Sequence, residues 1–156
     1  MQDMLVRLYD LPGCEGERAR LLGEGVGCRR AESFERGRVL AFVRDRWASW
    51  GDELLAAFAH LPPTVYIAVE GPDIVGFACY NANRPDFFGP TGVDESQRKR
   101  GVGRVLLVQC LAALAAEGYA YAIIGGVGPA KFYEHSVGAE LIAGSSPGIF
   151  GVMDNA

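Results

Sequence analysis

The hydrophobic pattern of the 156-residue chain alternates between the two-residue period of strands and the longer period of helices. Its first half predicts a strand, two helices and three strands, at residues 26–31, 33–47, 49–61, 64–70, 74–80 and 86–93. Ser33 is the expected cap of the first helix, and Ser49-x-x-Asp52 has the form of a capping box for the second. The pair Pro62-Pro63 ends that second helix.

The second half predicts a helix, a strand, a short helix and two final strands, at residues 102–117, 119–125, 129–137, 139–143 and 149–153. The nearly continuous apolar stretch 119–125 is typical of a central strand covered on both faces. Ahead of all these elements, residues 5–9 suggest a short strand and residues around Arg20 a short helix. We expect residues 1–25 to be an extension added to the main domain.

Length and composition predict one domain, residues 1–156, with a single core. A net charge of −4 argues against a nucleic-acid partner, which normally requires a basic face. No apolar stretch approaches the roughly 20 residues of a membrane span, and the N-terminus lacks a secretory segment. We therefore expect a cytoplasmic protein with neither a nucleic-acid nor a membrane partner.

The cysteines and histidines do not predict a metal site. Four cysteines are scattered without a Cys-x-x-Cys pair, and the chain has two histidines. Cys79 and Cys110 stand in apolar surroundings and are expected to be reduced core thiols.

Cations and glycines concentrate between the third consecutive strand and the helix after it. Four of the fifteen Lys and Arg residues fall within residues 98–104 of this acidic chain. Gly101 and Gly103 let the backbone approach a ligand closely, and the first amides of a helix attract an anion. The arrangement predicts a phosphate or diphosphate site, with a solvated basic turn as the alternative. It is not a Walker loop, because no Gly-Lys-Ser/Thr follows, and it is not a dinucleotide fingerprint, because Leu106 stands at the third glycine position.

Two local motifs carry a family resemblance. Arg98-x-x-Gly101-x-Gly103, between a strand and a helix, resembles the pyrophosphate loop of the GNAT superfamily of acyl-CoA-dependent N-acyltransferases. Phe132-Tyr133-Glu134 resembles the Phe-Tyr-Glu that opens the family's second cofactor motif. The predicted order of elements from residue 26 to residue 153 is also the GNAT order. The resemblance implies an α/β (α+β) fold, a mixed, mostly antiparallel sheet of about six to seven strands flanked by about four helices.

The same resemblance implies acetyl-CoA as co-substrate, with no metal. The loop residues that would hold its phosphates are Arg98, Lys99, Arg100, Gly101, Val102, Gly103 and Arg104. In the family, the fourth and fifth core strands separate to admit the pantetheine arm, and the fourth carries a bulge. Thr91, Gly92 and Val93 would lie beside that arm, and Pro90 suits the bulge because it cannot donate to a ladder. Gly126 stands where many members have the asparagine that bonds pantetheine.

Tyr133 matches the family's general acid. A tyrosine has a pKa of about 10, so it is protonated near pH 7 and can donate to a departing thiolate. Packing under the short helix is the alternative role. No base for the amine stands out: Glu53, Glu70, Asp86 and a water chain are all candidates.

Several aromatic residues are either core residues or walls of an acceptor pocket. These are Trp47, Trp50, Tyr80, Phe87, Phe88 and Phe150.

The residues and the resemblance together predict an N-acetyltransferase that transfers an acetyl group from acetyl-CoA to a primary amine by direct attack. The acceptor would be a small molecule or a peptide amine. A non-catalytic CoA-binding sensor or regulatory module is the alternative, and a nucleotide-phosphate binder of different chemistry is a third hypothesis. Because many family members pair through their C-terminal strands, the resemblance also suggests a homodimer.

Overall fold

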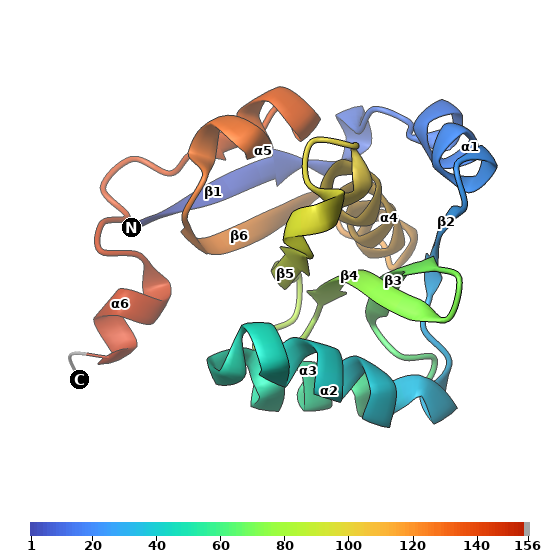
Figure 1. Ribbon diagram of the computed structural model, residues 1–156. Helices are drawn as coiled ribbons and strands as arrows, with labels where there is room; N and C mark the ends of the chain where they lie inside the picture. Colours follow the sequence, from blue (N-terminus) through green and yellow to red (C-terminus); the bar gives the residue numbers. More distant parts are fainter. Residues whose placement is uncertain (155–156) are drawn as a thin grey trace.

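The computed structural model describes residues 1–154, which form a seven-stranded sheet in the order β2-β3-β4-β5-β6-β1-β7 (Figure 1). The strands are β1 (Gln2–Arg7), β2 (Val26–Arg30), β3 (Val65–Glu70), β4 (Asp73–Tyr80), β5 (Phe87–Val93), β6 (Tyr121–Val127) and β7 (Glu140–Leu141). Neighbouring strands are antiparallel except β5 and β6, which are parallel. The expected mixed, mostly antiparallel sheet is confirmed.

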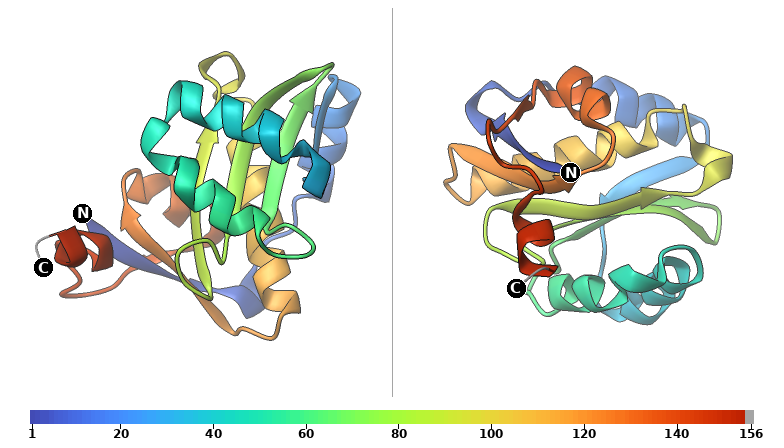
Figure 2. Two further views of the ribbon diagram at one scale, coloured as in Figure 1. Left: turned by 90° about the horizontal axis from the view of Figure 1, so that it is seen from below. Right: turned by 90° about the vertical axis from the view of Figure 1, so that its left-hand side faces the viewer.

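Helices cover both faces of this sheet (Figure 2). They are α1 (Glu15–Gly23), α2 (Arg36–Arg46), α3 (Gly51–Phe58), α4 (Val102–Ala116), α5 (Ala130–Val137) and α6 (Ile149–Asp154). The pair α2 and α3 lies on one face, and α1, α4 and α5 lie on the other. Across residues 1–154, every helix is too short or too polar to cross a membrane.

The core consists of one apolar cluster on each face of the sheet. On the α4 side, Leu106, Leu107 and Leu111 are fully buried. On the α2–α3 side, Leu54 and Phe77 are fully buried. Because α4 is apolar around most of its circumference, it lies deep between the sheet and α1 and α5. Its N-terminus is therefore held rigidly at the edge of the core.

The N-terminal strand is a structural part of the domain, and its interpretation as an added extension was wrong. β1 lies between β6 and β7, and Met4 pairs with Ile124 on one side and Leu141 on the other. Met4 and Val6 are fully buried. Alternating hydrophobicity indicates a strand, but the edge that the strand pairs with depends on distant residues. The predicted helix around Arg20 is confirmed as α1.

The predicted last strand at residues 149–153 was also wrong, because this segment is the helix α6. The other predicted C-terminal strand is shortened to β7, Glu140–Leu141. The physical reason is that β1 already occupies the edge of β6. Both ends of the chain are tied together there, since the Asp3 carboxylate accepts hydrogen bonds from the amides of Gly126 (2.9 Å) and Ile149 (3.0 Å). The homodimer stays a prediction.

The two predicted helix caps differ from the structure. Glu32 and Glu35 form the capping box, at a 3-10 turn that leads into α2, in place of Ser33. A second 3-10 turn (Ala48–Trp50) leads into α3, and no side chain caps that helix. A tighter turn ahead of a helix supplies some of its backbone bonds and moves the capping position.

Candidate active site

The parallel strands β5 and β6 are paired only at their beginnings. Phe87 lies opposite Ile123 and Phe88 opposite Ile124, and in residues 1–154 no later residues of these two strands are paired. Gly89, with a φ of 114°, and Pro90 follow at this point. The register between β4 and β5 shifts here too, which confirms the expected bulge. The backbone of β5 from Gly89 to Val93 therefore has no ladder partner in β6.

The loop before α4 has the backbone conformation of an anion site. Gly101 is the N-cap of α4 with a φ of 92°, a left-handed conformation that favours glycine, and no side chain caps this helix. Lys99, two residues earlier, also has a positive φ of 65°. The first amides of α4 are consequently available to an anion at the positive end of the helix dipole.

Gly103 connects this loop to the separated strands. A Cβ on Gly103 would lie 3.6 Å from Val93 in β5 and 3.7 Å from Phe132 in α5. The Phe132 ring contacts Tyr133 edge to face at 5.1 Å between centroids, and Tyr133 contacts Phe88 at 6.2 Å. The two motifs recognised in the sequence are thus joined by a continuous series of side-chain contacts that reaches the point where β5 and β6 separate.

Tyr133 is buried, with 6% of its surface exposed. Burial raises the pKa of its phenol to about 12, and no charged or hydrogen-bonding side chain offsets this shift. Desolvation disfavours the phenolate. The phenol therefore stays protonated over the whole neutral pH range, and it also packs in the core.

The cations of the loop have different partners. Arg100 pairs with Glu24, the C-cap residue of α1 (3.2 Å), and with Glu70 of β3 (3.3 Å). Arg104 pairs with Glu17 of α1. Arg98 and Lys99 are exposed. Arg100 thus ties the loop to α1 and β3. Glu70, a candidate base, is paired with Arg100 at the loop and does not lie where β5 and β6 separate.

Three other predicted cofactor residues have structural contacts of their own. The Thr91 hydroxyl donates to the carbonyl of Phe77 at 3.1 Å. A Cβ on Gly92 would lie 2.5 Å from the Trp47 ring, so only glycine fits there. The Gly126 N–H is engaged by Asp3 and is therefore not free for pantetheine. No motif in the sequence indicated the role of Asp3.

Glu53 lies on the α2–α3 side at the level of the bulge. Ala78 pairs with Thr91 and Tyr80 with Phe88, so Cys79 between them lies opposite the extra residues Gly89 and Pro90. Cys79 belongs to the same apolar cluster as Leu54, the α3 residue next to Glu53, and the charge of Glu53 adds to the effect of burial, which raises the pKa of the Cys79 thiol. Burial raises the pKa of Glu53, and a hydrogen bond with Asn83 partly opposes this.

Asp86, the third candidate base, lies on the opposite face at the closed end of the strand pair. Burial, together with the charge of Glu117 at the end of α4, raises the pKa of Asp86 to about 6. Its backbone carbonyl accepts from the amide of Ile123 at 3.1 Å, before the strands separate. Glu53 is therefore the candidate carboxylate that lies beside the bulge on the α2–α3 side.

The aromatic candidates divide between the two faces. Tyr80 and Phe88 belong to the buried cluster on the α4 side, so core packing is their role. Trp47 and Trp50 are half-buried and stacked, with centroids 5.6 Å apart. Phe150 of α6 lies against Gly125 and against Phe87, at 6.3 Å between ring centroids. The α2–α3 face therefore has aromatic side chains on both sides of the bulge.

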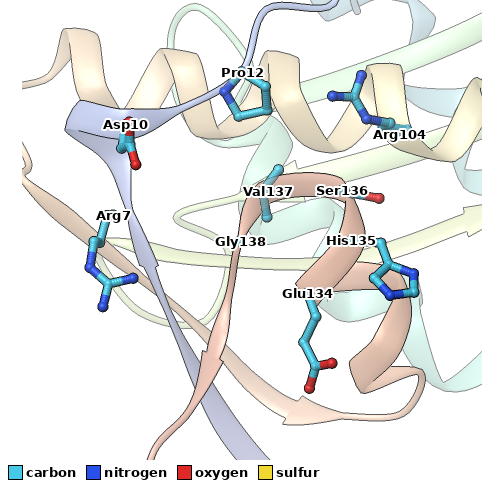
Figure 3. Close-up of a pocket in the computed structure, with 9 residues that line it drawn as sticks. All are labelled: Arg7, Asp10, Pro12, Arg104, Glu134, His135, Ser136, Val137 and Gly138. Atoms are coloured by element: carbon cyan, nitrogen blue, oxygen red, sulfur yellow. The ribbon is translucent and has the colours of Figure 1, made fainter.

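A hollow of about 320 Å³ lies between α5, the start of α4 and the segment after β1. Figure 3 shows Glu134 and His135 on α5 on one side of it and Arg104 of α4 across from them. Its lining residues are Arg7, Asp10, Pro12, Arg104, Glu134, His135, Ser136, Val137 and Gly138. The hollow shares Arg104 with the loop.

The model of the acetyltransferase (GNAT) family matches residues 31–138, more than two thirds of the sequence. The chain belongs to the GNAT family. The fold of this GNAT protein also resembles solved structures. One is the GCN5-related glucosamine N-acetyltransferase region of a fungal multi-domain GH3 β-N-acetylglucosaminidase, with a TM-score of 0.73 and 16% identity over 90% of this chain and 19% of that one. A second is a GCN5-related N-acetyltransferase from Sphaerobacter thermophilus, with a TM-score of 0.65 and 17% identity over 90% of this chain and 48% of that one.

A Drosophila protein matches with a TM-score of 0.61 and 15% identity, over 90% of this chain and 47% of that one. This GNAT chain thus spans about half or less of these three structures. No curated protein matches the sequence. At these identities the solved structures establish the fold, and the family model supports acyl transfer in general.

Proposed function

We propose that this GNAT protein transfers the acetyl group of acetyl-CoA to a primary amine. The observation that carries the proposal is the link through Gly103, which joins the open amides of α4 to the separated strands by way of Val93 and Phe132. The same series of contacts thus connects the regions proposed for the phosphate end and the thioester end of an acyl-CoA. A turn that binds only a phosphate would not need the separated strands β5 and β6.

The residues present suit acyl-CoA. The amides at the start of α4, with Arg98 and Lys99 beside them, would hold the diphosphate. The unpaired backbone of β5 would bond the pantetheine arm and the acetyl carbonyl, and it would stabilise negative charge that develops on that oxygen. Acetyl-CoA supplies an acyl group on a good leaving group.

The chemistry requires proton transfers at the amine and at the sulfur. The amine nitrogen forms a bond to the thioester carbon, the carbon–sulfur bond breaks, and Tyr133 donates its phenolic proton to the leaving thiolate. The nitrogen loses a proton to water as the amide forms, and water returns a proton to the Tyr133 phenolate. The ammonium form of the acceptor must first lose a proton. Glu53 on the α2–α3 side is the side chain that we assign to take it, directly or through water.

The acceptor is proposed to be the amine of a small molecule or of a peptide. The net charge of −4 favours a cationic acceptor. The fungal region of similar fold is described as a glucosamine N-acetyltransferase, which agrees with an amine as acceptor.

The decisive experiment measures thermal unfolding with CoA, acetyl-CoA and ATP at matched concentrations. A ligand at about 100 times its Kd adds ~2.7 kcal/mol to stability, so we expect clear shifts with both CoA compounds and none with ATP. Gly103→Val should remove these shifts, because its side chain would enter the space between Val93 and Phe132.

Gly37→Val is the matched control, since a Cβ on Gly37, another helical glycine, meets no atom within 4 Å. Absence of any shift with CoA compounds would refute the proposed cofactor. Stabilisation by ATP alone would favour a nucleotide-phosphate binder. CoA binding without transfer to any amine would favour the sensor or regulatory module.

Glu53→Gln is expected to lower kcat/KM at neutral pH by about 10²-fold, because a general base contributes about 10²–10⁴-fold. The raised pKa of Glu53 means that the wild-type rate should fall with decreasing pH at a point above the usual range of a glutamate. This acidic limb should be absent from the variant. Asp52→Asn, one residue away and exposed, is the control. An unchanged pH profile in Glu53→Gln would assign the proton transfer to water or to another group.

A further inference from the structure

The helix α1 lies directly on the phosphate loop. Its charged residues Glu17 and Arg20 and its C-cap residue Glu24 recur at the spacing of one helix face. The Arg20 guanidinium donates to the carbonyl of Arg100 at 2.6 Å, and Glu24 pairs with the Arg100 side chain at 3.2 Å. Leu21 alone among the α1 residues is buried in the core. The charged face of α1 is therefore turned toward the loop.

Glu17 brings a negative charge to the start of α4. One carboxylate oxygen of Glu17 accepts from the Arg104 guanidinium. The other would lie 3.7 Å from a Cβ on Gly101, the N-cap of α4. The carboxylate is thus placed where the helix dipole and the open amides attract an anion. It binds Arg104 and lies beside the N-cap of α4, and both features would otherwise serve a phosphate group.

The other acidic groups around the loop act elsewhere. Glu24 and Glu70 both bind Arg100 and brace the loop from α1 and β3. Glu95 lies 3.8 Å from Arg98 in an exposed pair. Glu17 differs from these three because it lies against the N-cap glycine itself. Arg104, which it binds, also lines the hollow beside the loop (Figure 3).

We propose that Glu17 is a built-in competitor of the cofactor phosphates, an anion of the protein's own chain that acyl-CoA must displace. This inference rests on the proposed function. In the free protein Glu17 neutralises Arg104 and screens the start of α4. When CoA binds, the carboxylate moves into solvent and Arg104 turns to a phosphate oxygen. The apparent Kd for CoA is then the intrinsic Kd divided by the fraction of molecules in which Glu17 is displaced.

The test is the affinity for CoA, measured by calorimetry at constant ionic strength on the wild type, Glu17→Gln and Glu15→Gln. Glu15 lies in the first turn of the same helix and is exposed, so its substitution changes the net charge equally without a contact to the loop. We expect Glu17→Gln to bind CoA about 2- to 10-fold more tightly, since a partly exposed ion pair is readily broken. Inorganic pyrophosphate should show a gain in the same direction.

Equal affinities in the two variants would overturn the proposal, because net charge would then explain any gain. Weaker binding by Glu17→Gln would overturn it as well, since Glu17 would then position Arg104 for the cofactor. If no protein in the series, the wild type included, binds CoA, the proposed function itself fails, and this result is distinct from the first two.

A second readout separates competition from a general structural effect. Without ligand, Glu17→Gln should unfold at a lower temperature than the wild type, because the pair with Arg104 is lost. With saturating CoA, its gain in melting temperature should exceed the wild-type gain. A smaller gain would contradict competition. Glu17→Ala replaces Glu17→Gln in both measurements if the latter does not fold.

Discussion

Tyr133→Phe is expected to slow acetyl transfer by about 10²–10⁴-fold, the range of a general acid. The phenol carries the proton that the leaving thiolate requires, and phenylalanine keeps the ring that packs on Phe88 and Phe132. Steady-state kinetics with acetyl-CoA and an accepted amine measure the effect, which should appear in kcat. CoA affinity should change little, because the phosphate loop is untouched.

Stability distinguishes a catalytic role of Tyr133 from a packing role. No hydrogen-bonding side chain offsets the effect of burial on its pKa, so loss of the hydroxyl should change the free energy of unfolding by less than about 1 kcal/mol. Tyr121→Phe removes a phenol at the exposed start of β6 and should keep the full rate. With a pKa of about 12, Tyr133 should cause no loss of rate below pH 10. A Tyr133→Phe enzyme with a normal rate would leave Tyr133 as a packing residue only.

Met4→Ala should destabilise the protein by about 2–5 kcal/mol, the usual effect of truncating a fully buried methionine. The strand that carries Met4 is paired on both sides, so the surrounding backbone cannot collapse easily into the space left behind. Thermal or urea unfolding measures the loss, which corresponds to a melting temperature lower by roughly 4–20 °C for a domain of this size.

Met153→Ala provides the matched control, because Met153 lies in α6 with 54% of its surface exposed. Its effect should stay within about 0.5 kcal/mol, as for other surface substitutions. If Met4→Ala were equally mild, β1 would be a detachable addition, as the sequence alone suggested, and the packing around β6 would need another explanation.

The sequence indicated the parts of the site that are local. The loop Arg98–Gly103 and the Phe132-Tyr133 pair each depend on residues close together in the chain, where glycine positions and helix starts have specific backbone causes. The bulge at Gly89-Pro90 was likewise readable, because proline cannot donate to a ladder. Contacts between distant segments could not be predicted from the sequence. Examples are the Asp3 carboxylate on the Gly126 amide and the Glu17 carboxylate on Arg104.

The charge spacing of Glu17, Arg20 and Glu24 is visible in the sequence, but the surface that it faces is not. The same applies to the candidate bases. Three carboxylates were equivalent in the sequence, and the structure separates them: Glu70 supports the loop, Asp86 lies at the closed end of the strand pair, and Glu53 lies beside the bulge.

The sequence by itself determined the kind and order of most elements, the GNAT resemblance and the position of the phosphate loop. Only the tertiary structure decided that β1 completes the sheet and that residues 149–154 form a helix. Periodicity reports which residues of one segment share a face. Which segment packs on that face, or pairs with a sheet edge, depends on competition between segments far apart in the chain. At β6, the N-terminal strand β1 occupies the edge.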